Sequence, residues 1–342
     1  MSFLVGKAVQ DVVAGAPNNG EGSDNIGVVK SMRVGRDTYP YVSAQAFRRW
    51  LRDSLPADEP RSKVTRDGKS GGKNQQAYTA GRPDLYLDDD LFGYMVAVKK
   101  ENFQRDTVLA TGTLVSVTPQ RPTLDFGTMS RDFPAGEHPV IHQHQLYSGV
   151  LAGDLLLDLP RVGVFETDGS GLRVAVAPAV AEEARSNGAE PLTFRGVAAV
   201  RLPLEERRRR VAVLLRALAS LRGGAKKALH YGDRTPALVL LAPVLGGVNP
   251  FTRVLAARDG RPVFDADVFR QEFKAWQDQL DGMVLIGWAP GFLGDQRDRV
   301  TADLKDLIDH KKVVVEHPRT VLTGLARRIE AGDHDDWFED AA

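Results

Sequence analysis

The spacing of hydrophobic and polar positions predicts strands and helices separated by long polar segments. Phe3 to Ala14 alternates loosely, which predicts a first, mostly buried strand, and Ile26 to Val34 predicts a shorter one. Leu204 to Arg222 predicts a helix, because acidic residues begin it, apolar residues recur at three- and four-residue spacing, and Gly223 follows it. Further strands are predicted at Leu91 to Val98, Val108 to Val117, Leu238 to Leu245 and Met283 to Trp288, and further helices at Phe269 to Gln279, Thr301 to Asp309 and Pro318 to Ala331. Val150 to Phe165 predicts a strand pair or one long strand broken at Gly153 or Pro160. The order strand, helix, strands, helix, strand is compatible with an α+β fold that has a ferredoxin-like or RRM-like core.

A capped amphipathic helix is predicted shortly after Tyr39. Ser43 is a good N-cap, and Pro56 ends the helix. One face carries Phe47, Trp50 and Leu51, and the other carries Arg48, Arg49 and Arg52. The helix dipole, the free N–H groups of the first turn and the arginines favour an anion such as phosphate. The same pattern is equally typical of an ordinary helix with a solvated basic face.

Two segments are too polar to form a core of their own. The first, from Pro56 to Asp84, is rich in Gly, Lys, Arg, Asn and Gln, which indicates a functional insertion or local disorder. The second, from Thr118 to Ser148, lies between predicted strands and carries Phe126, Met129 and Phe133. A β-hairpin or arm that projects from the sheet fits this second segment.

Charge is distributed unevenly along a chain whose formal net charge is zero. Lys30 to Arg82 holds twelve Lys or Arg against five Asp or Glu, and Glu205 to Arg234 holds nine against three. These excesses favour contact with a polyanion.

At 342 residues and 42% hydrophobic content the chain can bury a sizeable core, and the absence of cysteine excludes disulfides and thiol chemistry. We find no long apolar run or signal segment and expect a cytoplasmic protein with no membrane contact.

Candidate binding residues cluster in three stretches, and each also has a structural explanation. Asparagines favour turns, and a glycine pair after a helix is commonly a C-cap. Donors to phosphate are available at Lys30, Arg33, Ser43, Gln45, Arg48, Arg49, Arg52, Gly223, Gly224, Lys226 and Lys227, and His230 and Tyr231 could stack on a base or sugar.

Metal binding and catalysis have weaker support. Asp88, Asp89 and Asp90 offer hard oxygen ligands, but adjacent aspartates on a strand would fan out. His138, His142 and His144 lack an evident fourth ligand for zinc, and a mobile arm with polar tips explains them better. No P-loop, GxGxxG, GxSxG or HExxH motif occurs. We therefore expect no metal, no cofactor and no catalytic residue.

Three blocks of sequence resemble a known family. The paired asparagines with Asn25, Lys30 and "YVSAQAFRRWLRDSL", the acidic "DLFGYM" at residues 90–95, and "GGAKKALHY" at residues 223–231 occur in the order typical of it. The chain resembles the CRISPR-associated backbone subunits of Cascade, which bind CRISPR RNA through an RRM-like domain, specifically the DevR branch of type I-B systems. The resemblance is specific from residue 18 to 236 and weak beyond about residue 250. For Asn18, Asn19 and Asn25 it implies contact with RNA or with an adjacent subunit.

The resemblance implies a hand-like fold: an RRM/ferredoxin-like palm with an inserted fingers region and a β-hairpin thumb. On this chain it implies palm residues at 1–55, 108–117 and 149–250, fingers at 56–107 and a thumb at 118–148. Phe126, Met129 and Phe133 would form the wedge of the thumb. Residues 251–342 would form a C-terminal region of helices and strands whose packing the sequence leaves open.

The implied function is that of a non-catalytic scaffold. Copies of the chain would stack helically along the guide spacer and order it for pairing with target DNA, next to end-capping, large and guide-processing subunits of the complex. The alternative is a metal-dependent ribonuclease, because related backbone subunits of type III complexes cut bound target RNA with an early aspartate. Asp24, with Asp11 before it, is the candidate here. A transcription regulator is disfavoured because no helix-turn-helix pattern occurs.

Overall fold

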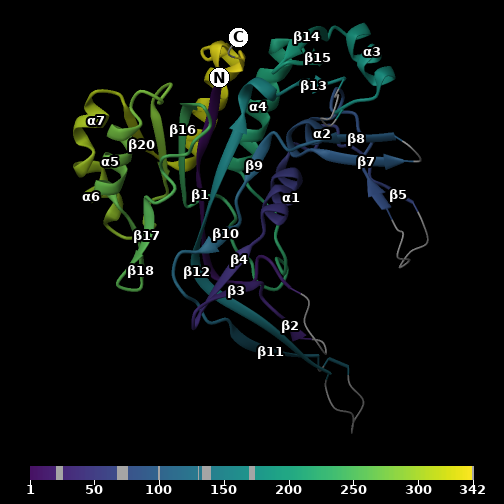
Figure 1. The fold of residues 1–342 in the computed structure, drawn as a ribbon. Helices are drawn as coiled ribbons and strands as arrows, with labels where there is room; N and C mark the ends of the chain where they lie inside the picture. Colours follow the sequence, from purple (N-terminus) through teal and green to yellow (C-terminus); the bar gives the residue numbers. More distant parts are fainter. Residues whose placement is uncertain are drawn as a thin grey trace.

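A computed structural model describes residues 1–20, 26–67, 76–98, 101–129, 131–132, 140–168 and 174–340. Its centre is a large, mostly antiparallel sheet (Figure 1). Along the sheet the strands follow the order β20 (Val313–Glu316), β19 (Val284–Trp288), β16 (Leu238–Leu245), β1 (Ser2–Gly15), β12 (Val140–Asp158), β10 (Leu114–Ser116), β4 (Asp37–Val42) and β3 (Ser31–Val34). Three further strands pair with β12, namely β2 (Ile26–Gly27), β9 (Leu109–Thr111) and β11 (Thr123–Met129).

The middle of this sheet has ferredoxin-like topology. β1 pairs antiparallel with both β12 and β16, and β9 and β10 pair antiparallel with β12. Helix α1 (Ala44–Ser54) lies in the connection from β1 to β9 and β10, and α4 (Leu204–Ala219) in the connection from β12 to β16. In chain order the four core strands are β1, β9 with β10, β12 and β16. In the sheet their order is fourth, first, third, second, and a helix lies in each crossover, as in a ferredoxin-like fold. The expected α+β fold with an RRM-like palm is confirmed.

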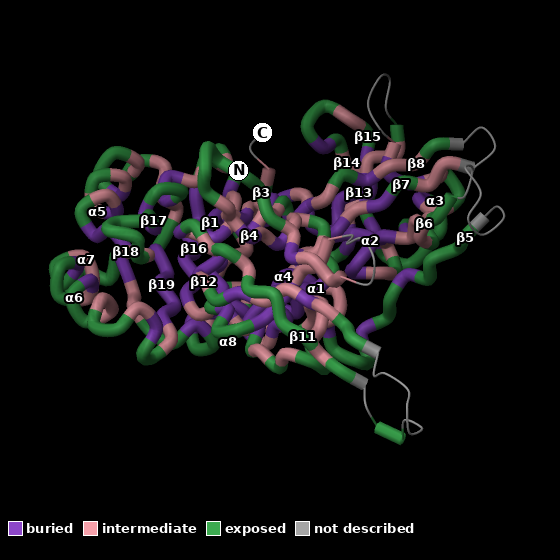
Figure 2. The backbone as a smooth tube through the Cα atoms, turned by 90° about the horizontal axis from the view of Figure 1, so that it is seen from below, coloured by how far each residue is buried: buried purple, intermediate pink, exposed green. Residues whose placement is uncertain are grey.

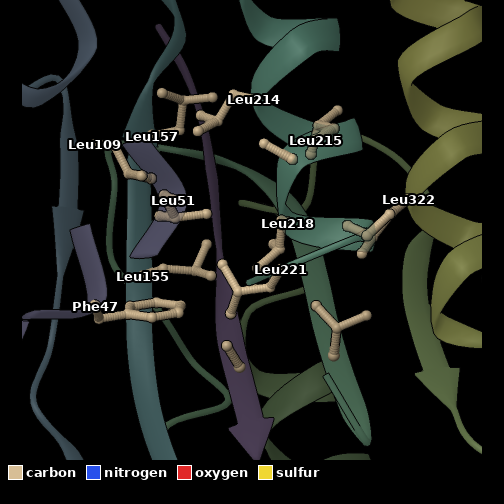
Figure 3. Close-up of a cluster of buried hydrophobic side chains, with 14 of the residues drawn as sticks. Phe47, Leu51, Leu109, Leu155, Leu157, Leu214, Leu215, Leu218, Leu221 and Leu322 are labelled. Carbon is tan, nitrogen blue, oxygen red and sulfur yellow. The ribbon is translucent and has the colours of Figure 1, made fainter. Parts of the chain in front are cut away.

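One face of the palm is covered by α1, α4 and α8 (Pro318–Ala331). Phe47 and Leu51 of α1 face Leu155 and Leu157 of β12, and the leucines of α4 complete the cluster (Figure 3). These side chains are almost fully buried, and each contributes about 1.5–3 kcal/mol through removal of apolar surface from water. The predicted helices at 204–222 and 318–331 are confirmed, because their apolar stripes match this face.

The opposite face of the same strands holds a second core. Val5 and Val9 alternate along β1 with the residues that face α1, as the pleat of a strand requires. They pack among aromatic residues of the C-terminal third, including Phe251, Phe269 and Trp288. This third contributes β17 (Leu255–Arg258), β18 (Arg261–Phe264), α5 (Ala266–Ala275), α6 (Gln296–Asp303) and α7 (Lys305–Asp309) besides β19, β20 and α8. The sequence left the packing of this C-terminal third open. The structure makes it part of the palm.

A second group of elements packs beside the palm. From the first half of the chain come β5 (Thr65–Asp67), β6 (Gln76–Tyr78), α2 (Leu87–Phe92), β7 (Tyr94–Val98) and β8 (Glu101–Arg105). From the second half come η1 (Leu159–Arg161), β13 (Val164–Glu166), α3 (Pro178–Ser186), β14 (Glu190–Phe194) and β15 (Val197–Arg201), with η2 (Asp335–Phe338) near the C-terminus. The two sets are joined where Gln104 N donates to Val174 O at 2.9 Å and Tyr94 Oη donates to Ala175 O at 2.5 Å.

A β-hairpin extends away from the palm at the lower end of Figure 1. β11 pairs antiparallel with the first part of β12, from Thr123 opposite Leu146 to Met129 opposite Val140. β12 then continues without a break into the centre of the sheet, where buried residues are concentrated (Figure 2). The strand predicted from Val150 therefore begins ten residues earlier, at Val140, and it breaks at Pro160, where η1 follows, and not at Gly153.

Three other predicted strands differ from the structure, and the one at 26–34 consists of the two separate strands β2 and β3. The aspartates at 88–90 and Leu91 belong to the helix α2 instead of a strand, so only Tyr94–Val98 of the predicted strand at 91–98 is extended. The segment 108–117 contains two short strands, because Gly112 crosses close to Asp154 between β9 and β10. Among the described residues no helix is both long and apolar enough to cross a membrane.

Candidate nucleic-acid interface

The start of α1 is built as the sequence predicted. Ser43 has extended backbone, and its Oγ accepts from Ala46 N at 3.3 Å. Phe47, Trp50 and Leu51 are buried in the palm core. Since the hydroxyl of Ser43 already caps the helix, any contact of Ser43 with phosphate would use its backbone or the helix dipole.

The three arginines of α1 lie outside its buried face, as predicted, but they differ in how free they are. Arg49 is exposed and pairs with Asp53 at 2.8 Å. Arg48 Nη1 donates to Thr111 Oγ1 at 3.1 Å, and burial together with the nearby Arg52 lowers the pKa of Arg48. Arg52 Nε lies 3.3 Å from the buried Asp88, and its guanidinium packs over Phe92. Contact with RNA stays a prediction for each arginine, and Arg49 is the most accessible of the three.

The aspartates of α2 are buried and each has a partner inside the protein. Asp88 accepts from Ser62 N at 3.1 Å, and Asp89 accepts from Arg82 N at 3.0 Å. Asp90 forms ion pairs with Arg105 and, at 2.8 Å, with Arg210. Burial raises the pKa of Asp89. These contacts tie α2 to α4 and β8, and no cluster of three metal-ligating side chains occurs in the part of the chain that is described.

The glycine turn brings three of the predicted stretches together. Gly223 and Gly224 have φ of +114° and +89°, values that favour glycine. A β-carbon on Gly224 would lie 3.2 Å from Pro17 O and 3.3 Å from Trp50 Cζ2. Ala225 N donates to Pro17 O at 2.8 Å. The turn is thus held between the loop that contains Asn18 and the indole of α1.

The asparagine loop is anchored to the segment that follows it. Lys30 N donates to Asn18 O at 3.2 Å, and Asn19 bridges Val29 in antiparallel fashion. Asn18 Nδ2 also reaches Tyr41 O at 3.5 Å. Arg33 lies on the exposed β3 and Gln45 is exposed on α1, away from these contacts. Asn25 and Asp24 lie outside the described residues.

The far end of the glycine turn meets the base of the hairpin. The His230 ring lies 4.9 Å from the ring of His144, whose Nε2 is 3.2 Å from Asp125 Oδ2. A β-carbon on Gly27 would lie 3.6 Å from Lys226 Nζ, so Lys226 borders the same place. Two residues were nominated to stack on a base or sugar. His230 packs against His144, whereas Tyr231 is 85% exposed. Lys227 is exposed too.

His142 and His144 belong to no metal-ligating cluster among the described residues. His142 is exposed while His144 is buried against His230, and His138 lies outside the described residues. The structural explanation of these histidines is favoured.

Many of the basic residues at 205–234 are buried or paired with acidic residues, which the count of charges could not reveal. Arg207 and Arg210 are buried, and Arg208, Arg209 and Arg216 pair with Asp335, Glu59 and Glu330. Lys227 is exposed and Lys226 is half-buried. Arg234 is only 4% exposed and has no carboxylate partner among the described residues. Arg234 was not among the predicted site residues. The signal in the sequence is Gly232 and Asp233 directly before it in "HYGDRTP", which mark a tight turn.

The hairpin carries exposed apolar side chains. Phe126 is 61% and Leu124 40% exposed on β11, and Ile141 is 59% exposed on β12. The register pairs Phe126 with Gln143 and Thr128 with Ile141, so these residues share one face of the hairpin. Of the other nominated wedge residues, Met129 lies at the end of β11 and Phe133 lies outside the described residues.

Comparison with known proteins identifies the fold. No family model and no curated protein matches the sequence. A chain in a structure described as "CRISPR RNA-guided surveillance complex, pre-nicking" has a similar fold, with a TM-score of 0.60, 14% identity and coverage of 96% of this chain and 99% of that chain. A chain in another, described as "CRISPR RNA-guided surveillance complex", gives a TM-score of 0.57 and 16% identity over 95% and 98% of the two chains. This chain shares its fold with these chains from CRISPR RNA-guided surveillance complexes. Because both identities are low, the likeness concerns the fold.

Proposed function

We propose that this chain is a non-catalytic, RNA-binding backbone subunit of a Cascade-type CRISPR surveillance complex. The observation that carries the proposal is the match in fold over nearly the whole length of both chains. The convergence of the asparagine loop, α1 and the glycine turn supports it, because this convergence gathers backbone N–H groups, amides and lysines in one place. On the sequence blocks quoted above, we assign the chain to the DevR branch of type I-B systems.

The chain would hold RNA through its phosphates and shape, and leave the sequence to be read by pairing with target DNA. Lys226, Lys227 and Arg49 supply charge, and the exposed ring of Tyr231 is available to stack on a base. Copies of the chain would lie side by side on one guide, with the exposed face of the hairpin against a neighbour. Other subunits would cap the ends of the guide.

The proposal is tested by expressing the chain with a CRISPR array and the neighbouring subunits, and measuring the native mass of the purified complex. We expect guide RNA to co-purify with several copies of the chain. Binding of the isolated protein to single-stranded RNA should weaken as salt rises, because phosphate contacts release counterions. Absence of RNA from the purified protein, together with no affinity at low salt, would refute the proposal.

The ribonuclease alternative has its own test. Asp11 lies near the end of β1, and burial raises its pKa. The purified complex would be incubated with complementary RNA and Mg²⁺, and the RNA analysed on a denaturing gel. We expect intact RNA. Cleavage that is lost in Asp24→Ala or Asp11→Ala would establish the alternative instead.

A further inference from the structure

Arg234 is a buried arginine with two unused donors. Its Nη1 donates to Asp233 O at 3.2 Å, whereas its Nε and Nη2 have no hydrogen-bond partner among the described residues. The guanidinium packs over Trp50, with 5.9 Å from its central carbon to the ring centroid. A buried cation without acceptors for its N–H groups is costly to a folded protein.

The other buried arginines of the chain are different. Arg105 donates to Asp90, Val164 O and Arg161 O. Arg207 donates to three backbone carbonyl groups, and Arg210 donates to Glu206, Asp90 and two carbonyl groups. At each of these three buried arginines the fold supplies several acceptors. At Arg234 it supplies one.

The two free donors have a particular geometry. Nε–H and Nη2–H point from the same edge of a guanidinium, and this edge forms two parallel hydrogen bonds to a carboxylate or a phosphate. Glycines border the guanidinium at Nε and at Nη1. A β-carbon on Gly224 would lie 3.1 Å from Nε, and one on Gly232 would lie 2.6 Å from Nη1.

A large cavity adjoins this site. It has a volume of about 910 Å³ and is lined by the end of β1, residues 231–237, residues 289–292 and the start of α8. Arg234 and Arg319 contribute positive charge to its lining. Asp11 and Asp233 contribute negative charge, although the Asp233 carboxylate is engaged by Thr235 through N at 2.9 Å and Oγ1 at 2.6 Å.

We propose that the free edge of Arg234 binds one phosphodiester group of single-stranded RNA, and that the segment 224–232 shifts to admit it. The inference rests on the proposed function, because RNA is chosen as the source of the anion from the position of Arg234. Arg234 lies directly against the glycine turn, with its guanidinium over the ring of Trp50. In the free protein the turn covers the edge, and the glycines at 223, 224 and 232 allow the covering segment to change its backbone angles.

The test compares Arg234→Met and Arg234→Lys with Arg222→Met. Arg222 is exposed and directly precedes the glycine turn, so its loss controls for one general positive charge. The probe is fluorescein-labelled oligouridylate, with affinity measured by anisotropy over a series of salt concentrations. The thermal midpoint of the RNA-free proteins is measured in parallel.

We expect Arg234→Met to weaken binding about tenfold more than Arg222→Met, since it removes a bidentate, charge-assisted contact. The slope of log affinity against log salt should fall by about 0.7, the loss of one phosphate contact on a single strand. Arg234→Lys should retain most of the slope but lose affinity, because an ammonium group lacks the two-donor edge. The midpoint of RNA-free Arg234→Met should be unchanged or higher, because an unpaired buried charge has been removed.

A structural arginine would give the opposite pattern. The proposal is overturned if both Arg234 variants bind oligouridylate as Arg222→Met does, or if Arg234→Met lowers the thermal midpoint while affinity is retained. Failure of both Arg234 variants to fold would also overturn it, since Arg234 would then be needed by the fold itself. If the wild-type protein does not bind the probe, the proposed function is refuted. This outcome is distinct from an effect at Arg234, which is seen only as a difference between the variants and wild type.

Discussion

The indole of Trp50 lies against the backbone of Gly223: a β-carbon at that glycine would be 3.0 Å from Trp50 Cδ1 and 3.3 Å from Trp50 Cα. The contact joins the core side of α1 to the glycine turn. A buried aromatic residue of the palm thereby sets the position of a loop that we assign to RNA binding.

Gly223→Ala should destabilise the protein through both the backbone and this contact. A non-glycine residue at φ of +114° is strained by about 1–2 kcal/mol, and the crowding against Trp50 adds about 1–3 kcal/mol. Gly188→Ala is the control, because Gly188 has φ of +96° but no atom within 4 Å of an added β-carbon. The free energy of unfolding, measured in urea, should fall further in Gly223→Ala than in Gly188→Ala. Equal losses would show that Trp50 does not restrain the turn.

The arginines of α1 should separate into binding and structural residues. Arg49→Ala should change stability by less than about 0.5 kcal/mol, because its pair with Asp53 is on the surface, and should weaken RNA binding. Arg52→Ala should cost about 1–3 kcal/mol, because Asp88 is left buried without its cation. Urea denaturation and RNA binding at matched salt would be measured for both variants. An Arg49→Ala variant with wild-type affinity would exclude this face of α1 from the interface.

Local periodicity predicted much of the palm. The strand at 238–245 and the helix at 318–331 have the predicted bounds, because a buried strand and an amphipathic helix each show their pattern within a few residues. The capped helix at 44–54 was predicted for the same reason. The C-terminal third was harder to place, since its aromatic residues pack on β1, which is far away in sequence.

Long-range pairing explains what could not be predicted at the site. Asp90 is buried because Arg105 and Arg210 reach it from β8 and α4, so three adjacent aspartates can form a buried helix. Arg52 was grouped with Arg48 and Arg49 as a contact for RNA, because its partner Asp88 lies on another helix and could not be identified from the sequence. Arg234 was overlooked because burial below the glycine turn depends on the tertiary fold.

The buried carboxyl group of Asp89 should make stability depend on pH. Burial raises the pKa of Asp89 above its usual value of 3.8. Its contribution to stability is therefore fully present below pH 3.8 and is lost as pH rises through the folded-state pKa, where the native protein must ionise a buried group. Asp89→Asn removes this titration and keeps an oxygen for Arg82 N. The variant should gain stability relative to wild type as pH rises from about 4 to neutral.

The measurement is urea denaturation at a series of pH values, with Asp58→Asn as the control for removing one exposed acidic group. A difference between Asp89→Asn and wild type that does not change with pH would contradict the prediction.

The apolar face of the hairpin should contribute to the assembly of copies of the chain on a guide and not to the free energy of unfolding of a single chain. Phe126 is 61% exposed and shares its face with Leu124 and Ile141, so this face has no core to fill within one chain. Phe126→Ser should leave the free energy of unfolding within about 0.5 kcal/mol of wild type. Phe47→Ala, the buried aromatic control, should lose about 3–5 kcal/mol.

Deletion of residues 126–136 extends the same argument to the tip of the hairpin. The shortened protein should fold and bind short RNA, because the palm, α1 and the glycine turn are intact. It should fail to form a regular array on a full guide, because an apolar wedge that separates bases or contacts the next copy is gone. Nuclease footprinting of the guide should show periodic protection with the wild-type protein and none with the deletion. Normal stoichiometry with an unchanged footprint would mean that this hairpin is not the thumb, and that the hairpin of β5 and β6 should be tested next.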